Sequence, residues 1–163
     1  MYNVGEMVFY GGHGVCEIEE ITTMTVSKEE KQYYRLKSHA QPALSLFHPV
    51  VTDNPKITKM LSKDEAKKLL KVFEQDASEW IERSPDRSKK YKQIMQGKDH
   101  EEIAQMMNTI LRKKKELEQI DKKLYAQDLE LIRTVYSILT DEISIALNMS
   151  KEDVIAQIEQ NMQ

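Results

Sequence analysis

The stretch from residue 84 to residue 115 most constrains the fold, because it carries its own helix boundaries. Ser84 followed by Pro85 is typical of a helix start, since a serine side chain can accept a backbone hydrogen bond and proline needs no N–H in the first turn. Gly97 is typical of a residue that ends a helix, and Asp99 can begin the next one. The sequence therefore predicts two adjacent helices separated by a tight turn.

These two helices gather positive charge in a chain whose net charge is −3. No acidic residue lies between Arg87 and Lys98, and four basic residues follow one another at positions 112–115. Clustered cations suit contact with nucleic-acid phosphates, whereas such runs in general are more often solvated helix surface, and from the residues alone both interpretations stay open. The residues predicted to contact DNA are Arg87, Lys89, Lys90, Lys92, Lys98, Arg112, Lys113 and Lys114.

The first 50 residues have the pattern of short strands instead. Apolar or alternating segments lie at residues 7–10, 15–21, 32–37 and 43–47, and the β-branched residues within 22–26 either continue the second segment or bend it. Gly, Pro and Ser cluster between them, as expected for turns, and Tyr34 and Leu36 share one face of the third segment. Because closing a sheet hides its edges, four or five short strands with tight turns favour a small β-barrel.

After a linker expected at residues 50–59, the pattern becomes helical. Ser62 and Glu65 form a capping-box sequence before an amphipathic segment. The further helices predicted are residues 63–74, a long amphipathic helix within 120–147 that ends at Asn148, and a last helix that begins at Ser150. The predicted fold class is α+β, with a β-barrel domain at residues 1–55 and an all-α helical bundle at residues 56–163.

Other features argue against several classes of protein. No apolar run approaches the ~20 residues of a membrane span, and the N-terminus lacks the pattern of a signal peptide. Cys16 is the only cysteine, which excludes an internal disulfide and suits the cytoplasm. His13 and Cys16 could form the nucleophilic pair of a small hydrolase, but a buried structural cysteine is favoured. No metal-ligand spacing or phosphate-binding loop occurs, so we expect no metal, cofactor or small-molecule substrate.

One N-terminal block is more specific, and it reads Gly5-x-x-Val8-x-Tyr10-x-x-His13-Gly14-Val15-x-x-Ile18-x-x-Ile21. It resembles the RNA polymerase-interaction domain shared by CarD/CdnL transcription regulators and the transcription-repair coupling factor. The likeness continues beyond the linker, where Arg87-Ser88-Lys89-Lys90-Tyr91-Lys92 and Gly97-Lys98-Asp99 resemble the CarD helical domain. No helicase motor is present, which favours the regulator over the coupling factor.

The resemblance implies a cytoplasmic, non-enzymatic transcription regulator that bridges RNA polymerase and promoter DNA. Its β domain, Tudor-like in the family, would add a strand edge to the polymerase β subunit. Its helical domain would contact promoter DNA through the backbone and minor groove at the upstream edge of the bubble, and so change the lifetime of the open complex. The residues expected to bind polymerase are Met24, Ala43, Leu44, Ser45, Leu46 and Phe47.

Two positions depart from the family pattern. Arg87 stands where these regulators carry a tryptophan that wedges the minor groove, while Trp80 lies seven residues earlier. Phe47 stands at a position that we match to a family arginine. We therefore expect DNA contact to centre on Arg87 and to depend on charge more than on wedging, with Trp80 acting mainly through stability. The alternative is an adaptor that binds polymerase and uses its helices for another protein.

Overall fold

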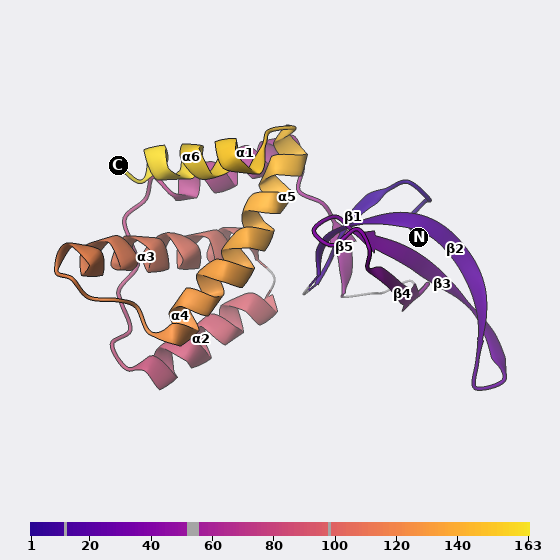
Figure 1. Ribbon diagram of the computed structural model, residues 1–163. Coiled ribbons are helices and arrows are strands. Elements are labelled where there is room, and N and C mark those ends of the chain that lie inside the picture. The colour runs from indigo at the N-terminus through magenta and orange to yellow at the C-terminus, as the bar shows by residue number, and fades with distance from the viewer. Residues whose placement is uncertain (12, 52–55, 98) are drawn as a thin grey trace. The chain divides into compact units, whose positions relative to one another are not determined.

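The computed structural model describes residues 1–11, 13–51, 56–97 and 99–163. The chain divides into two compact units, Met1–Leu61 and Ser62–Gln163 (Figure 1). Strands build the first unit and helices build the second, so the predicted α+β class is confirmed.

A five-stranded antiparallel sheet forms the first unit. Its strands are β1 (Met7–Tyr10), β2 (Gly14–Val26), β3 (Glu29–Ser38), β4 (Ser45–Pro49) and β5 (Ile57–Lys59). Their order in the sheet is β4-β3-β2-β1-β5, and each neighbouring pair is antiparallel. Among the described residues β4 and β5 are the two edges of the sheet. The sheet is therefore not closed, and the predicted barrel is not confirmed.

The core of the sheet unit is built from apolar side chains of four strands. They are Val8, Cys16, Ile18, Tyr34, Leu36 and Ile57. Tyr34 and Leu36 are buried together, as their alternation predicted. The linker prediction is wrong for residues 57–59, because Ile57 pairs with Tyr10 and is only 3% exposed. A three-residue strand is too short to show alternation, so the sequence pattern did not reveal β5.

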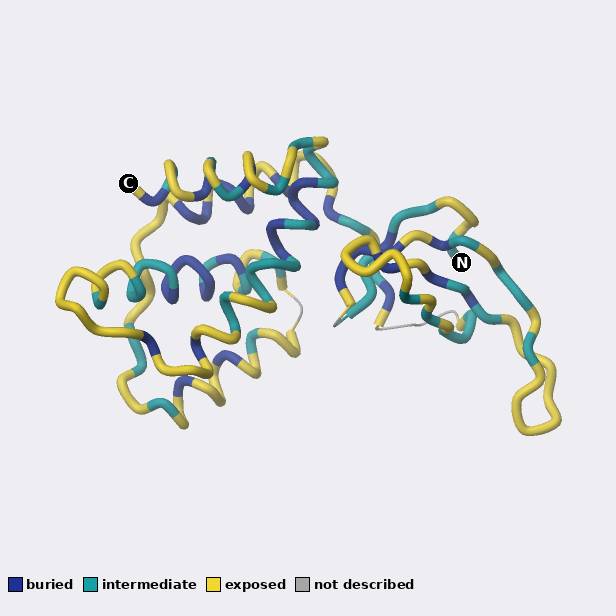
Figure 2. Tube along the Cα trace, viewed as in Figure 1, coloured by how far each residue is buried: buried dark blue, intermediate teal, exposed yellow. Residues whose placement is uncertain are grey.

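The hairpin of β2 and β3 extends beyond the rest of the sheet and has an exposed end (Figures 1 and 2). Its turn residues Ser27 and Lys28 have φ angles of 53° and 66°, which is the left-handed backbone that two-residue hairpin turns require. The pairing register shifts between Ile18 and Glu20, which marks a β-bulge in β2. The bulge twists the hairpin and changes which side chains of β2 oppose β3.

The second unit is helical. Its elements are α1 (Lys63–Val72), α2 (Ser84–Gly97), α3 (His100–Gln119), α4 (Ala126–Leu131), the π-helical turn η1 (Ile132–Tyr136), α5 (Ser137–Leu147) and α6 (Lys151–Asn161). The elements α4, η1 and α5 follow one another without a break and make the long helix that was predicted. This helix begins at Ala126, six residues after the expected start at residue 120.

Local capping signals account for most of the helix boundaries. Ser62 and Glu65 form the predicted capping box, in which each side chain accepts a hydrogen bond from the backbone N–H of the other. The other predicted caps also occur, with Asp99 before α3, Asn148 after α5 and Ser150 before α6. Ser84 is already inside α2, so that helix begins one residue earlier than predicted.

Helix α1 packs against α3, α5 and α6, and α2 packs against α3. Large apolar side chains from these helices are almost completely buried, among them Leu69, Phe73, Met107, Ile110, Ile143 and Ile158. The buried side chains of α3, Met106, Met107 and Ile110, thus belong to the core of the bundle. This packing fixes the position of α2, which carries part of the candidate site of the helical unit.

Candidate nucleic-acid and polymerase interfaces

Arg87 lies on the inner side of α2 and is only 2% exposed. Its Nε and Nη2 atoms donate to the two carboxylate oxygens of Asp128, at 3.1 Å and 2.6 Å. Its Nη1 atom donates to the backbone carbonyl of Ile81 at 2.8 Å. The hydrogen bonds to Asp128 raise the pKa of Arg87, so the guanidinium stays charged. The side chain therefore ties α2 to α4, and its burial argues against the DNA contact that was predicted for Arg87.

Trp80 is half-buried beside the same ion pair. The guanidinium carbon of Arg87 lies 4.5 Å from the centre of the indole ring, and the ammonium nitrogen of Lys113 lies 5.6 Å from it. Such cation–π contacts favour a fixed, partly desolvated ring. This placement agrees with the expectation that Trp80 acts through stability, which stays a prediction.

Arg112 of α3 is also engaged inside the helical unit. Its Nη2 atom donates to the backbone carbonyl of Phe73 at 2.8 Å, and its Nη1 donates to that of Met162 at 3.3 Å. Its Nε donates to the side-chain oxygen of Asn108 at 2.9 Å. Carbonyls at helix ends lack intrahelical partners, so Arg112 satisfies groups that α1 and α6 leave open. Its three nitrogens thus take part in packing, although the residue is only half-buried, and the DNA contact of Arg112 stays a prediction.

Lys113 and Lys114 each have an acidic neighbour on α3. Lys113 lies 3.4 Å from Glu116, and Lys114 lies 2.9 Å from Glu118. These distances join the ammonium nitrogens to carboxylate oxygens three and four residues further along the helix, which is the usual spacing of helical ion pairs. The pairs reduce the positive potential that this end of α3 offers to a phosphate.

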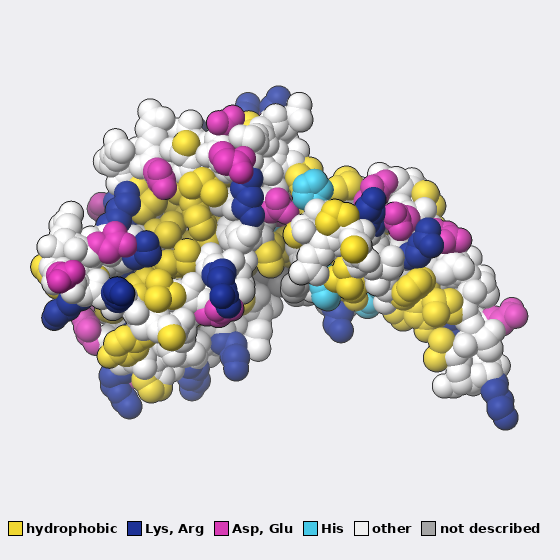
Figure 3. All heavy atoms as spheres, viewed as in Figure 1, with side chains coloured by type: hydrophobic (Ala, Val, Ile, Leu, Met, Phe, Trp, Pro, Cys, Tyr) yellow, Lys and Arg dark blue, Asp and Glu magenta, His cyan; other side chains and the backbone are white. Residues whose placement is uncertain are grey.

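Three further predicted DNA contacts belong to α2 and are exposed. We call Lys89, Lys90 and Lys92 the α2 lysines; none of them forms an ion pair with another described residue. Basic side chains project along the edge of the helical unit that α2 forms (Figure 3). Lys98 lies outside the described residues. The geometry therefore narrows the candidate nucleic-acid interface to the α2 lysines.

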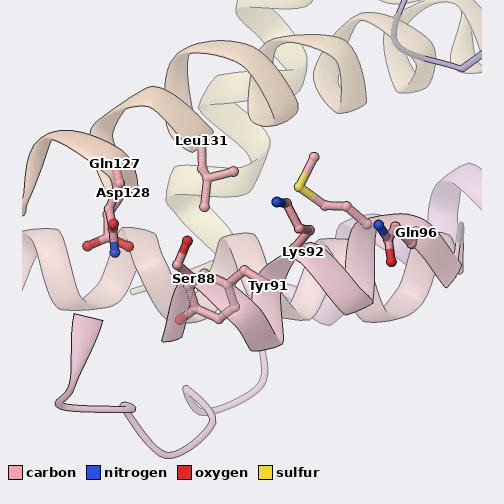
Figure 4. Close-up of a pocket in the computed structure, with 8 residues that line it drawn as sticks. Ser88, Tyr91, Lys92, Gln96, Gln127, Asp128 and Leu131 are labelled. Atoms are coloured by element: carbon pink, nitrogen blue, oxygen red, sulfur yellow. The ribbon is translucent and has the colours of Figure 1, made fainter. Parts of the chain in front are cut away.

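A groove with a volume of about 420 Å³ runs between α2 and α4, beside the α2 lysines (Figure 4). It is lined by Ser88, Tyr91, Lys92, Met95, Gln96, Gln127, Asp128 and Leu131. Burial raises the pKa of Tyr91 to about 12, so its hydroxyl stays protonated at neutral pH. The five lining residues of α2 recur at the spacing of one helix face, so the sequence alone indicates that they lie on the same side of α2. The facing residues of α4 could not be matched to them without the fold.

The polymerase-binding prediction falls on β4 and the loop before it. In the described part of the chain β4 pairs only with β3. The backbone of Leu44 accepts from Ser38, and the N–H of Val50 donates to Gln32. Leu44 and Val50 therefore direct their backbone groups at β3. Because the backbone groups of successive residues in an antiparallel strand point alternately to its two sides, the N–H groups of Ser45 and Phe47 point away from β3, to the free edge. This edge can receive a further strand.

Phe47 is 47% exposed on the outer face of β4 and lies opposite Arg35 of β3. Arg35 contacts two acids that the β-bulge of β2 brings together, with nitrogen–oxygen distances of 3.5 Å to Glu19 and 3.4 Å to Glu20. An apolar ring and a guanidinium therefore stand side by side at the edge. Because Arg35 lies between the buried Tyr34 and Leu36 in β3, its side chain is on the face of the strand opposite the core.

The other predicted polymerase contacts lie in different places. Leu46 is half-buried and packs against the sheet core. Ala43 and Leu44 precede β4 instead of belonging to it. Met24 pairs with Lys31 in the extended part of the β2–β3 hairpin, away from the register of β4. The free edge itself thus contains only Ser45, Leu46 and Phe47 of the predicted set.

Cys16 is completely buried, and burial raises the pKa of its thiol to about 11. Its sulfur lies 3.8 Å from the carbonyl oxygen of Gly14, while His13 is exposed and stacks on Tyr10. A protonated, buried thiol is a poor nucleophile. Among the described residues no group of three or more His, Cys, Asp or Glu side chains is arranged to hold a metal.

Comparison with known families identifies the first unit. Residues 2–60 match the family described as the CarD-like/TRCF RID domain, and the comparison with curated proteins gave no match. The N-terminal unit is therefore a polymerase-interaction domain of this type, as its glycine-histidine turn predicted. A domain of this type indicates interaction with RNA polymerase in transcription, and the type is not a class of enzyme.

No described helix is long and apolar enough to cross a membrane. The matched residues end before α1, so the likeness of the helical unit to CarD stays a prediction.

Proposed function

We propose that this protein is a transcription regulator that joins the β subunit of RNA polymerase to promoter DNA. The RID-type unit binds polymerase through the free edge of β4, and the α2 lysines contact the DNA backbone near the upstream edge of the bubble. Holding both partners changes the lifetime of the open promoter complex. The observation that carries this proposal is a match to a polymerase-interaction domain in which, over the described residues, β4 pairs with another strand on one side only.

The polymerase contact can be tested at a single backbone group. Proline at Ser45 removes an N–H that points outward, so the pairing of β4 with β3 should survive while pairing with an incoming strand is lost. We expect Ser45→Pro to fold and to lose capture of the polymerase β subunit. Leu46→Pro is the matched control, because it removes an N–H directed at β3 and should destabilise the sheet. A folded Ser45→Pro protein that captures polymerase at full strength would exclude this edge as the contact.

The DNA contact can be tested by its dependence on salt. Each lost phosphate contact should reduce the slope of log affinity against log salt concentration by about 0.9. We expect Lys89→Gln and Lys92→Gln each to flatten the slope for a promoter duplex. Lys114→Gln is the matched control, since its ammonium already pairs with Glu118 and should change the slope less.

A second candidate function is an adaptor whose helical unit binds another protein. It is favoured by exposed apolar side chains within and after the α3–α4 connection, where Ile120 is 59%, Tyr125 62% and Leu129 39% exposed. A protein partner of this surface would bind with little dependence on salt. If the helical unit shows no salt-dependent affinity for DNA, and Tyr125→Ala removes a captured protein, the adaptor replaces the regulator.

A further inference from the structure

We infer that the groove between α2 and α4 holds an unpaired DNA nucleotide, with its base on the apolar floor and its phosphate beside the α2 lysines. The inference rests on the proposed DNA contact of the helical unit. It adds the form of DNA that the groove accepts, namely a base released from the duplex at the edge of the promoter bubble.

The wall that α2 contributes is a continuous stripe of side chains. Its members are Ser88, Tyr91, Lys92, Met95 and Gln96. They recur with the spacing that places residues on one side of a helix, and together they span about 12 Å along its axis. Leu131 and Gln127 of α4 complete the groove on the opposite side (Figure 4). A volume of about 420 Å³ lies within the range of small-ligand sites, about 300–1,000 Å³.

The floor and the rim of the groove differ in polarity. Leu131 is half-buried, Met95 is 37% exposed and the ring of Tyr91 is largely covered, so the floor offers apolar contact. Ser88 and Gln96 lie on the rim, and neither side chain forms a hydrogen bond with another described residue. A nucleobase has apolar faces and a polar edge, so it would meet apolar atoms below and hydrogen-bonding groups at the side.

The charges around the groove favour an anion. Asp128 is the only acid in its lining, and its carboxylate is already paired with Arg87 at 2.6 Å. Lys92 lies in the wall, and Lys89 follows about 60° further round α2. Both ammonium groups can therefore approach a phosphate of a strand whose base enters the groove.

An unpaired nucleotide fits these observations better than a duplex or a protein segment. Inside a duplex the base faces are stacked, so they cannot reach an apolar floor. A protein segment would need both an apolar anchor and an acidic neighbour in its own sequence. Every nucleotide of a single strand carries both features, and single-strand sites in general combine a cationic groove with platforms for bases.

The test measures the fluorescence anisotropy of labelled DNA with the full-length protein. The probes are an oligothymidine of about 12 nucleotides and a duplex of equal length. Gln96→Glu adds a negative charge in the groove, and Gln93→Glu adds the same charge to an exposed residue of α2 that does not line it. We expect Gln96→Glu to weaken single-strand binding about fivefold more than Gln93→Glu, and both to weaken duplex binding equally. Met95→Ala should weaken single-strand binding about fivefold and leave duplex binding unchanged.

The outcomes separate the groove from the proposed function. If Gln96→Glu and Gln93→Glu weaken single-strand binding equally, or if the wild type binds duplex but not oligothymidine, the groove inference is overturned while the duplex contact of α2 stands. If the wild type binds neither probe, the proposed DNA contact fails together with the groove. Circular dichroism of each variant establishes that the helical unit is folded.

Discussion

Removing the guanidinium of Arg87 should strongly destabilise the helical unit, because it would leave a buried carboxylate without its partner. The side chains of Arg87 and Asp128 are 3% and 1% exposed, and two hydrogen bonds join them. Breaking a buried ion pair by removing one member costs about 3–5 kcal/mol. We therefore expect Arg87→Ala to reduce the free energy of unfolding of the helical unit by about that amount.

The double replacement Arg87→Met with Asp128→Leu removes both charges and fills the space with apolar groups. Such replacements are often close to neutral. Here the carbonyl of Ile81 would also lose its donor, so we expect a net loss of about 1 kcal/mol. Arg133→Ala is the control, since Arg133 of the same unit also contacts an acid, Glu130 at 2.6 Å, but is 78% exposed, and it should cost about 0–1 kcal/mol.

Urea unfolding followed by tryptophan fluorescence measures this effect directly, because Trp80 is the only tryptophan and lies in the helical unit. Far-ultraviolet circular dichroism provides a second probe of the same transition. A loss below about 1 kcal/mol for Arg87→Ala would refute the reasoning, since it would mean that the carboxylate of Asp128 is solvated.

Three further predictions concern stability. The hydrogen bond from His100 to the buried carboxylate of Glu142, at 2.7 Å, raises the pKa of His100 above its usual 6.5. This stabilisation is complete below about pH 6.5 and is lost as pH rises through the folded pKa, so the urea midpoint of the helical unit should fall as pH rises above about 6.5, and His100→Gln should flatten that fall. Cys16→Ala should cost about 1–2 kcal/mol and leave polymerase capture unchanged; loss of capture in a folded protein would contradict a purely structural thiol. Asn108 is completely buried and donates to two backbone carbonyls, so Asn108→Ala should cost about 1–3 kcal/mol in the same unfolding assay, and a neutral result would contradict those contacts.

Local signals predicted the secondary structure well, because their causes act within a few residues. The capping box at Ser62 and the left-handed Asn148 are examples, since the hydrogen-bonded groups at each cap lie within four residues of one another in the chain. The ion pairs of Lys113 and Lys114 obey the same local rule and could have been predicted from the acids three and four residues later. Recognising them would have weakened the prediction of DNA contact on α3.

The role of Arg87 could not be predicted in this way, because its partner lies 41 residues later in the chain. Sequence periodicity shows which side of a helix is apolar, but it does not show that a charged residue on that side has a distant counter-ion. Arg87 also aligns with the position at which the family carries its wedge tryptophan. This match at one residue favoured the prediction that Arg87 is exposed and contacts DNA. The open edge of β4 was predicted from family resemblance, whereas the extra strand β5 was concealed by its length.

The basic residues of α2 face different sides of the helix because each residue is rotated by about 100° from the one before it. Arg87 and Tyr91 are four residues apart, so both face the bundle, and both are buried. Lys89 and Lys92 lie about 200° and 140° from Arg87, and therefore face solvent beside the groove. The same helix thus uses one cation to hold its position against α4 and leaves the others for phosphates. Asp128 both binds Arg87 and lines the groove. A substitution of Asp128 will therefore alter the stability of the helical unit and the shape of the groove at the same time. The DNA affinities of such variants must be compared at an equal fraction of folded protein.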